Sequence, residues 1–369
     1  MYYIYEKRRK QAVAKWEDLG KPNPYVKKDP VKRKINLLKR PYKHSCQVYP
    51  AFFLINLSFP NESNVFEPAM TKDAIKIYEG QGGDYHAINT TFLQTSGILE
   101  QAISYAENGT NMKNLKQVLK VPKNLLSNIK KNKKRFTFIT NGVKAFSRMD
   151  YYDEKKGDFV NAIDFESGGL HQNMILIDNK KKTVGYFEPH GIDEANPDLL
   201  NFIKKNIAKP LGYKFIENKE NEPDENDLLL GDILNGNEIK KLIKSIKKND
   251  KFKNDFKTQG DINLFSGRGI QFLENYGDSI YFEGLCQIWS LHFNLLRLQS
   301  PNKKIQTVYN EWFKKLDYDI EKIRVYFYDL INKIHDTLDL ILGDNYNTTM
   351  TIEQMVKKIK TYLNNHKVF

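Results

Sequence analysis

The chain has 369 residues, of which 40% are hydrophobic and 12% aromatic, so it can bury the core of one large or two modest domains. It has no run of about 18 apolar residues and no apolar segment after its first charges, so we expect neither a membrane-spanning helix nor a secretory signal peptide. With two cysteines, Cys46 and Cys286, it excludes a disulfide framework and a four-cysteine zinc site and suits a reducing compartment.

The net charge of +13 is concentrated in residues 1–45, a basic N-terminal arm with 14 Lys and Arg against 4 Asp and Glu. Tyrosine and tryptophan residues are interleaved with these basic side chains. Such an arm is typical of a surface that contacts nucleic acid or an acidic protein. A solvated tail explains the charge equally well, because no nucleic-acid-binding motif accompanies it.

Residues 46–134 are expected to form an accessory region. The apolar run at residues 52–57 predicts a strand, and small and apolar residues at helical spacing predict a helix within residues 89–108. Apolar residues at three- and four-residue steps in the lysine-rich residues 113–134 indicate a short amphipathic segment.

A core region is expected over residues 135–300, with a hairpin at its centre. The elements around this hairpin are predicted in chain order as a strand at 135–140, a polar connection at 150–157, a helix at 199–207 that Pro210 ends, a strand at 213–216, a helix at 239–246 and a loop that continues to 261.

The hairpin carries the first candidate site residues. Residues 174–177 are apolar on both strand faces, as in a central strand that is covered on both sides. After a polar turn at 179–182, the β-branched and aromatic residues 183–187 predict a returning strand. If the turn is centred between residues 180 and 181, Glu188 lies opposite Asn173.

His171 would then lie on the same face as Asn173, one diagonal step from Glu188. Diagonal partners in a hairpin have Cβ atoms about 7–8 Å apart, within reach of a histidine and a glutamate. The carboxylate would orient the imidazole ring and stabilise its charged form. A shift of one residue in the register would separate the two side chains.

Cys286 follows Gly284 and precedes an apolar stretch that predicts a buried helix. The free N–H groups and the dipole at the start of a helix stabilise a thiolate and lower the pKa of a thiol there. A small buried residue with no chemical role is the alternative reading. Trp289, one turn further on, is expected to pack under the hairpin.

Residues 301–369 are expected to form a helical C-terminal extension. Three segments carry apolar residues at helical spacing, at 305–316, 320–340 and 351–363. Their aromatic residues are interpreted as core stripes rather than as a ligand site.

The order of His171, Glu188, Gln271 and Cys286 resembles the adenain and SUMO-deconjugating cysteine peptidases. A His-x-Asn-x-x-x-Ile-Asp strand, a Phe-Glu-Pro-His-Gly strand end and a Gly-x-Cys-x-x-Trp-Ser helix start resemble still more closely the peptidases of large nucleocytoplasmic DNA viruses. The residue before the cysteine is aromatic in those peptidases and is Leu285 here. The resemblance covers about residues 135–300.

This resemblance implies an α+β fold with a papain-like or adenain-like core, in which a central mixed sheet packs on a buried helix that starts at the catalytic cysteine. It implies His171 as general base, Glu188 as its orienter, Cys286 as nucleophile and Gln271 as oxyanion donor. Gln271 lies 15 positions before Cys286, farther than in the family. That departure places the oxyanion donor in question.

Other groups compete for these roles. His190 faces His171 in the expected register and is an alternative base. Asp178 is an alternative orienter, at the turn end of its strand. A zinc site of His171, His190 and Cys286 is conceivable, but the paired short ligand spacings are missing. His292 follows Cys286 by about 600° of helix rotation and therefore does not project beside the thiol.

The resemblance implies a viral thiol endopeptidase that cleaves structural or core precursor proteins during virion assembly, in the virion and the host cytoplasm. Two alternatives remain open, a virion scaffold protein that keeps an inactive peptidase fold, and an enzyme that removes ubiquitin-like modifiers. The sequence requires no cofactor, although DNA or a peptide could act as an activator by analogy with the family.

Overall fold

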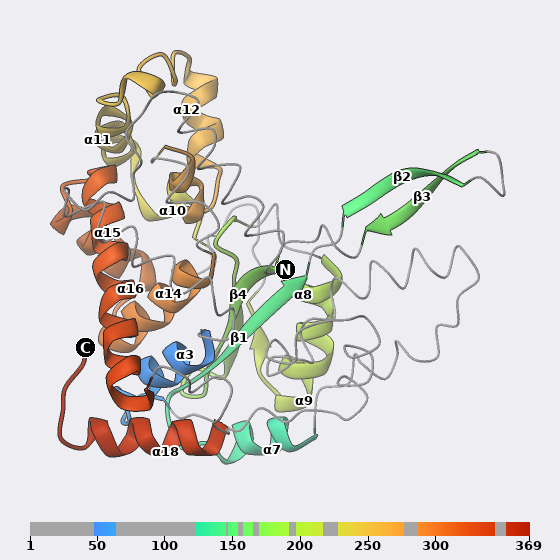
Figure 1. Ribbon diagram of the computed structural model, residues 1–369, viewed down its shortest axis with the longest axis vertical. Coiled ribbons are helices and arrows are strands. Elements are labelled where there is room, and N and C mark those ends of the chain that lie inside the picture. Colours follow the sequence, from blue (N-terminus) through green and yellow to red (C-terminus); the bar gives the residue numbers. More distant parts are fainter. Residues whose placement is uncertain are drawn as a thin grey trace.

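The computed structural model of the protein describes residues 48–63, 123–144, 147–153, 158–164, 170–191, 197–216, 228–276, 286–343 and 352–369. These residues form an α+β fold, as expected, in which a small mixed sheet lies between two groups of helices (Figure 1). The basic arm and the predicted helix at 89–108 lie outside the described residues. The division of the chain into four regions stays a prediction.

The main sheet has four strands in the order β1-β4-β5-β6. Strands β1 (Phe136–Lys144) and β5 (Thr183–Phe187) each pair in antiparallel fashion with β4 (Leu170–Asp178). The short β6 (Lys214–Phe215) runs parallel to β5. The apolar segment 174–177 therefore lies on a central strand, as its sequence predicted.

Successive residues of β4 alternate between two hydrophobic clusters. Ile175 and Ile177 belong to a smaller cluster, and Met174 and Leu176 belong to the larger one. The smaller cluster is covered by α7 (Lys123–Lys131), α8 (Pro197–Ile203), the π-helix η5 (Lys204–Ala208) and α9 (Lys209–Leu211). Because of this alternation, one face of β4 packs against the larger cluster and the other face packs against the smaller cluster.

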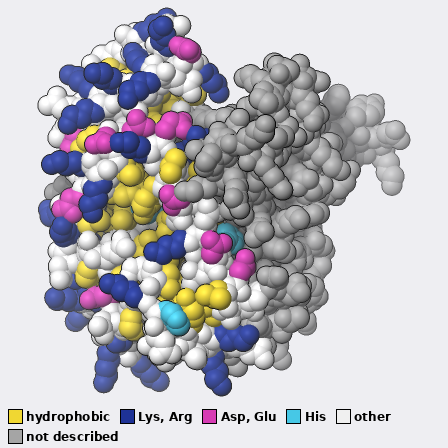
Figure 2. All heavy atoms as spheres, turned by 60° about the vertical axis from the view of Figure 1, so that its left-hand side comes forward, with side chains coloured by type: hydrophobic (Ala, Val, Ile, Leu, Met, Phe, Trp, Pro, Cys, Tyr) yellow, Lys and Arg dark blue, Asp and Glu magenta, His cyan; other side chains and the backbone are white. Residues whose placement is uncertain are grey.

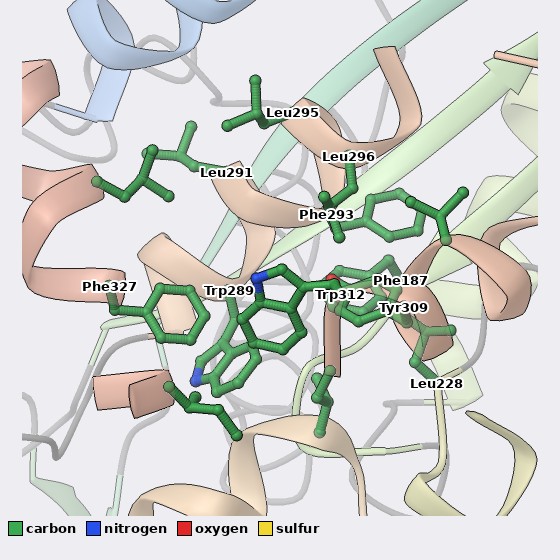
Figure 3. Close-up of a cluster of buried hydrophobic side chains, with 14 of the residues drawn as sticks. Phe187, Leu228, Trp289, Leu291, Phe293, Leu295, Leu296, Tyr309, Trp312 and Phe327 are labelled. Atoms are coloured by element: carbon green, nitrogen blue, oxygen red, sulfur yellow. The ribbon is translucent and has the colours of Figure 1, made fainter. Parts of the chain in front are cut away.

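Helix α14 (Cys286–Gln299) lies at the centre of the larger cluster, as its apolar sequence predicted. Phe293 of α14 stacks on Phe187 of β5 with ring centroids 4.3 Å apart and planes 4° apart (Figure 3). Among the other helices that contribute to the same cluster are α3 (Val48–Leu57), α15 (Ile305–Lys315), α16 (Ile320–Leu342) and α18 (Ile352–Leu363). The three predicted C-terminal helices are confirmed.

The predicted strand at residues 52–57 is wrong, because these residues belong to helix α3. Almost the whole segment is buried against α14, α16 and α18. A short run that is apolar in every direction fits a buried strand and a buried helix equally well, so periodicity could not separate them. Tertiary packing made the choice.

Two other predicted boundaries are wrong. Part of the expected polar connection at 150–157 belongs to a separate hairpin, β2 (Ser147–Asp153) with β3 (Asp158–Asp164). Pro210 does not end its helix, which continues through the π-type turn into α9 and stops at Gly212, whose φ is +72°. The longer hydrogen-bonded turn accommodates the proline, which lacks an N–H, and the left-handed glycine then ends the helix.

Residues 228–276 form a helical lobe with α10 (Leu230–Ile233), α11 (Gly236–Ile246) and α12 (Gln259–Ser266). The predicted loop to residue 261 contains the start of α12, which a capping box opens. Figure 2 shows Lys and Arg side chains at the end of the molecule where Figure 1 places this lobe. The exposed lysines there are Lys240, Lys241, Lys244, Lys248, Lys251, Lys253 and Lys257.

Within the described ranges, no helix is both long enough and apolar enough to cross a membrane.

Candidate functional site

The register of the central hairpin is the predicted one. Met174 pairs with Phe187 and Ile175 with Tyr186, so the turn is centred between residues 180 and 181. Continuing this register by one step places Asn173 opposite Glu188. The Nδ2 group of Asn173 donates a hydrogen bond of 3.2 Å to Oε2 of Glu188, as this placement requires.

Glu188 is a buried carboxylate, 2% exposed, immediately after β5. Its Oε2 also accepts a 3.1 Å hydrogen bond from the hydroxyl of Tyr186, which in turn is hydrogen-bonded to Asn173. Its Oε1 accepts a 3.2 Å hydrogen bond from the backbone N–H of His190. A buried carboxylate needs such donors, because losing water without replacement is costly.

His171 belongs to β4, where its backbone pairs with Val143 of β1. The position of its side chain lies outside the described residues. The predicted contact between His171 and Glu188 therefore stays a prediction, and the structure supplies only the register on which it depends.

Gln271 is brought to the end of this hairpin by its backbone. Its N–H donates a 2.8 Å hydrogen bond to the carbonyl of Pro189, and the N–H of Gly269 donates one of 3.1 Å to the carbonyl of His190. The two chain segments approach so closely that a Cβ on Gly269 would lie 2.2 Å from the backbone nitrogen of Gly191. Gln271 is thus adjacent to Glu188 in space although it is distant in sequence.

The 3-10 helix η7 (Ile270–Tyr276) also carries Glu274, a buried residue that the sequence analysis did not identify. Oε1 of Glu274 accepts a 2.8 Å hydrogen bond from Nε1 of Trp289, and its Oε2 accepts one of 3.3 Å from Nε2 of Gln271. The signal in the sequence was a single acidic residue in a short segment that also carries Ile270, Phe272, Leu273 and Tyr276. Its burial could not be foreseen without the fold.

Cys286 is the first residue of α14 and is 5% exposed. Its position at the start of a buried helix agrees with the sequence prediction. Trp289 follows it by three residues and is hydrogen-bonded to Glu274. The structure thus links the first turn of α14 to Gln271, and Gln271 to the segment that follows Glu188.

We expected Trp289 to pack under the hairpin, but it packs against α16 instead. Its ring lies on Phe327 of α16 with centroids 4.3 Å apart, whereas Phe293 stacks on the hairpin (Figure 3). Residues 289 and 293 are four apart and so lie on the same side of α14. Because this helix is apolar over a wide face, that side contacts both α16 and the hairpin.

The rival residues have other surroundings. Asp178 lies at the far end of β4, where it forms an ion pair of 3.4 Å with Arg135 and accepts hydrogen bonds from the N–H groups of Lys180 and Lys181. These contacts give it a structural role in the turn. The side chain of His190 is exposed, while its backbone bonds Glu188.

His292 lies in an aromatic cluster away from Cys286, as its position on the helix predicted. Its ring is fully buried beside Trp312, with centroids 4.6 Å apart, and beside Phe327, at 5.1 Å. Burial lowers the pKa of His292 to about 3. It is therefore neutral at neutral pH and keeps no charge to offer a reacting group.

Among the described side chains, no three His, Cys, Asp or Glu residues are grouped so that they could hold a metal ion. Comparisons with protein-family models, with curated proteins and with solved structures find no match to this chain.

Proposed function

We propose that the protein is a cysteine endopeptidase with Cys286 as nucleophile and His171 as general base. Glu188 orients the imidazole, and Gln271 and the backbone N–H of Cys286 stabilise the oxyanion. The observation that carries the proposal is the hydrogen-bonded convergence of three distant segments, the end of β5, η7 and the start of α14. We also propose that the α+β core is of the papain-like or adenain-like type.

The chemistry follows from the placement of these groups. In a strand, residues two apart share a face, so β4 is expected to carry His171 on the face of Asn173, beside Glu188. Cys286 opens α14, and the first turn of that helix is linked through Trp289 and Glu274 to Gln271, whose backbone bonds Pro189. Its thiolate adds to a peptide carbonyl, and water then hydrolyses the acyl-enzyme.

Alkylation of the thiol tests this proposal directly. Iodoacetamide labelling of Cys286 is measured against pH in the Cys46→Ser background, with and without His171→Ala. An activated thiol reacts well below pH 8.5, the ordinary pKa of cysteine being about 8.5, and loses that reactivity in the His171→Ala variant. A thiol that reacts only at high pH, or that is indifferent to His171, contradicts the proposal and favours a virion scaffold protein.

By resemblance to the viral peptidases, we propose that the substrates are viral structural or core precursors that are cleaved during assembly. Precursor processing in infected cells should stop with Cys286→Ala. If processing continues in that variant, this biological role is wrong. Covalent reaction of the protein with a ubiquitin-like vinyl sulfone would instead favour removal of ubiquitin-like modifiers.

A further inference from the structure

We propose that Glu274 is a positioning residue that aims the side-chain amide of Gln271 at the oxyanion formed on Cys286. This inference rests on the proposed peptidase function. It concerns a residue that does not itself touch the reacting atoms and acts only through Gln271.

The carboxylate of Glu274 is shared between two elements of the site. One oxygen accepts from the indole of Trp289 at 2.8 Å, and the other accepts from the amide of Gln271 at 3.3 Å. All three side chains are buried. Because water does not compete there, the two hydrogen bonds tie the amide of Gln271 to the first turn of α14.

The carboxylate also decides which way the amide points. The NH₂ group of Gln271, not its carbonyl, faces Glu274, because its Nε2 donates to Oε2 of the carboxylate. One N–H of that group is used by Glu274, and the other remains to donate to an oxyanion. Within the described residues, Oε1 of Gln271 has no hydrogen-bond partner, so Glu274 is the group that orients the amide there.

The location of the amide suits this role. The backbone N–H of Gln271 donates a 2.8 Å hydrogen bond to the carbonyl of Pro189, the residue after Glu188. Trp289 is three residues from Cys286, and residues at this spacing are neighbours on one side of a helix. The long chain segment between Gln271 and Cys286 is therefore bridged in space by the side chain of Glu274.

The step that Glu274 would support is acylation. The thiolate of Cys286 forms a C–S bond with the carbonyl carbon, and the π electron pair moves to the oxygen. The N–H of Gln271 donates to that oxyanion. When the intermediate collapses, the carbonyl re-forms and the C–N bond breaks; the amine departs with the bonding pair and takes the proton that His171 received from the thiol.

A pair of reactions separates this role from a merely structural one. Acylation of Cys286 by p-nitrophenyl acetate passes through an oxyanion, and the released p-nitrophenolate reports it. Alkylation by iodoacetamide displaces iodide at a saturated carbon and forms no oxyanion. Both rates are measured on the full chain in the Cys46→Ser background.

We expect Gln271→Ala to slow acylation about 100-fold, the usual effect of losing one oxyanion donor. Glu274→Gln replaces one of the two acceptor oxygens with an NH₂ group, so one of the two donors loses its acceptor, and we expect acylation to slow about 10-fold. Alkylation should be unchanged in both variants. In the Gln271→Ala background, Glu274→Gln should slow acylation no further, because the group that it positions is gone. Glu311→Gln, at an exposed carboxylate paired with Lys303, is the control.

Several results overturn the proposal. Equal slowing of acylation and alkylation by Glu274→Gln makes the residue structural, and faster acylation means that its charge opposes the oxyanion. Full additivity with Gln271→Ala shows that it does not act through Gln271. If Glu274→Gln does not fold, Trp289→Phe releases the same carboxylate, and unchanged acylation in that variant refutes the tie to α14.

A wild-type thiol without His171-dependent reactivity removes the peptidase function itself, and the role of Glu274 falls with it. An activated wild-type thiol with normal acylation in Glu274→Gln removes only the role of Glu274. The two failures are therefore distinguishable.

Discussion

Glu188 and His292 are both buried and titratable, yet their surroundings differ completely. Glu188 accepts hydrogen bonds from Asn173, Tyr186 and the backbone of His190. Neither ring nitrogen of His292 has a hydrogen-bond partner among the described residues. Aromatic rings surround the imidazole instead, including those of Trp312 and Phe327.

The difference shows that burial alone does not identify a functional group. The donors around Glu188 replace the water that its carboxylate loses on burial, so each of its oxygens keeps a hydrogen-bond partner. Burial of His292 without donors disfavours its charged form, so the ring serves as a packing unit. The same aromatic environment raises the pKa of Tyr326 to about 12 through burial.

The largest effect is expected where the backbone of residues 269–271 contacts the backbone of residues 189–191, just after Glu188. We expect Gly269→Val to lower the free energy of unfolding by roughly 3 kcal/mol or more, because the new side chain cannot fit without parting the two backbones. A Cβ there would lie 2.2 Å from the backbone of both His190 and Gly191. Urea unfolding, followed by circular dichroism, measures the change.

Gly236→Val is the matched control, because a Cβ at Gly236 meets no atom within 4 Å. Its effect should stay within about 0.5 kcal/mol. Equal stabilities of the two variants would contradict the close approach of residues 269–271 to residues 189–191.

Removing the carboxylate of Glu188 should have the next largest effect. Glu188→Ala takes away the acceptor that three buried or backbone donors share, and we expect a loss of roughly 2–3 kcal/mol in the free energy of unfolding. Thermal and urea unfolding at pH 7 measure it. Glu311→Ala, at an exposed ion pair with Lys303, should cost less than about 1 kcal/mol. If Glu188→Ala lowered the free energy of unfolding as little as Glu311→Ala, the donors around Glu188 would be able to bond water once the carboxylate is removed.

The smallest effect at neutral pH is expected at His292, and acid reveals it. The pKa of His292 is about 3 in the folded protein against 6.5 ordinarily, so the unfolded chain binds an extra proton between these values. Stability should therefore fall as pH drops from 6.5 towards 3, by up to about 1.4 kcal/mol per pH unit from this residue.

His292→Leu replaces the ring with an apolar side chain and should flatten this part of the pH dependence. Unfolding midpoints between pH 4 and pH 7 test it, with His366→Leu at an exposed histidine as the control, since His292 remains in that variant. An unchanged slope in His292→Leu would show that the ring is solvated in the fold.

The parts of the fold that local sequence patterns predicted are those with a clear period. The polar turn and the apolar strands around it predicted the β4–β5 register to the residue, and with it the neighbourhood of Asn173 and Glu188. Helical spacing predicted α11 and the three C-terminal helices. The start of α14 at Cys286 followed from the glycine and the apolar stretch around it.

Where the period was absent, prediction failed. The apolar residues of α3 fit either a strand or a helix, and contacts with α14, α16 and α18 decided between them. Pro210 was expected to end a helix, but the helix continues through a π-type turn and past the proline. Glu274 has no motif, and only its buried contacts with Trp289 and Gln271 reveal it.

The sequence by itself determined the strand register, the buried helix that opens at Cys286 and the helical C-terminal segments, because each depends on neighbours along the chain. Only the tertiary structure decided that Gln271 lies beside Pro189, that Glu274 links it to Trp289, and that His292 is enclosed by aromatic rings. Those contacts join residues far apart in sequence, and they form only when the elements pack against one another.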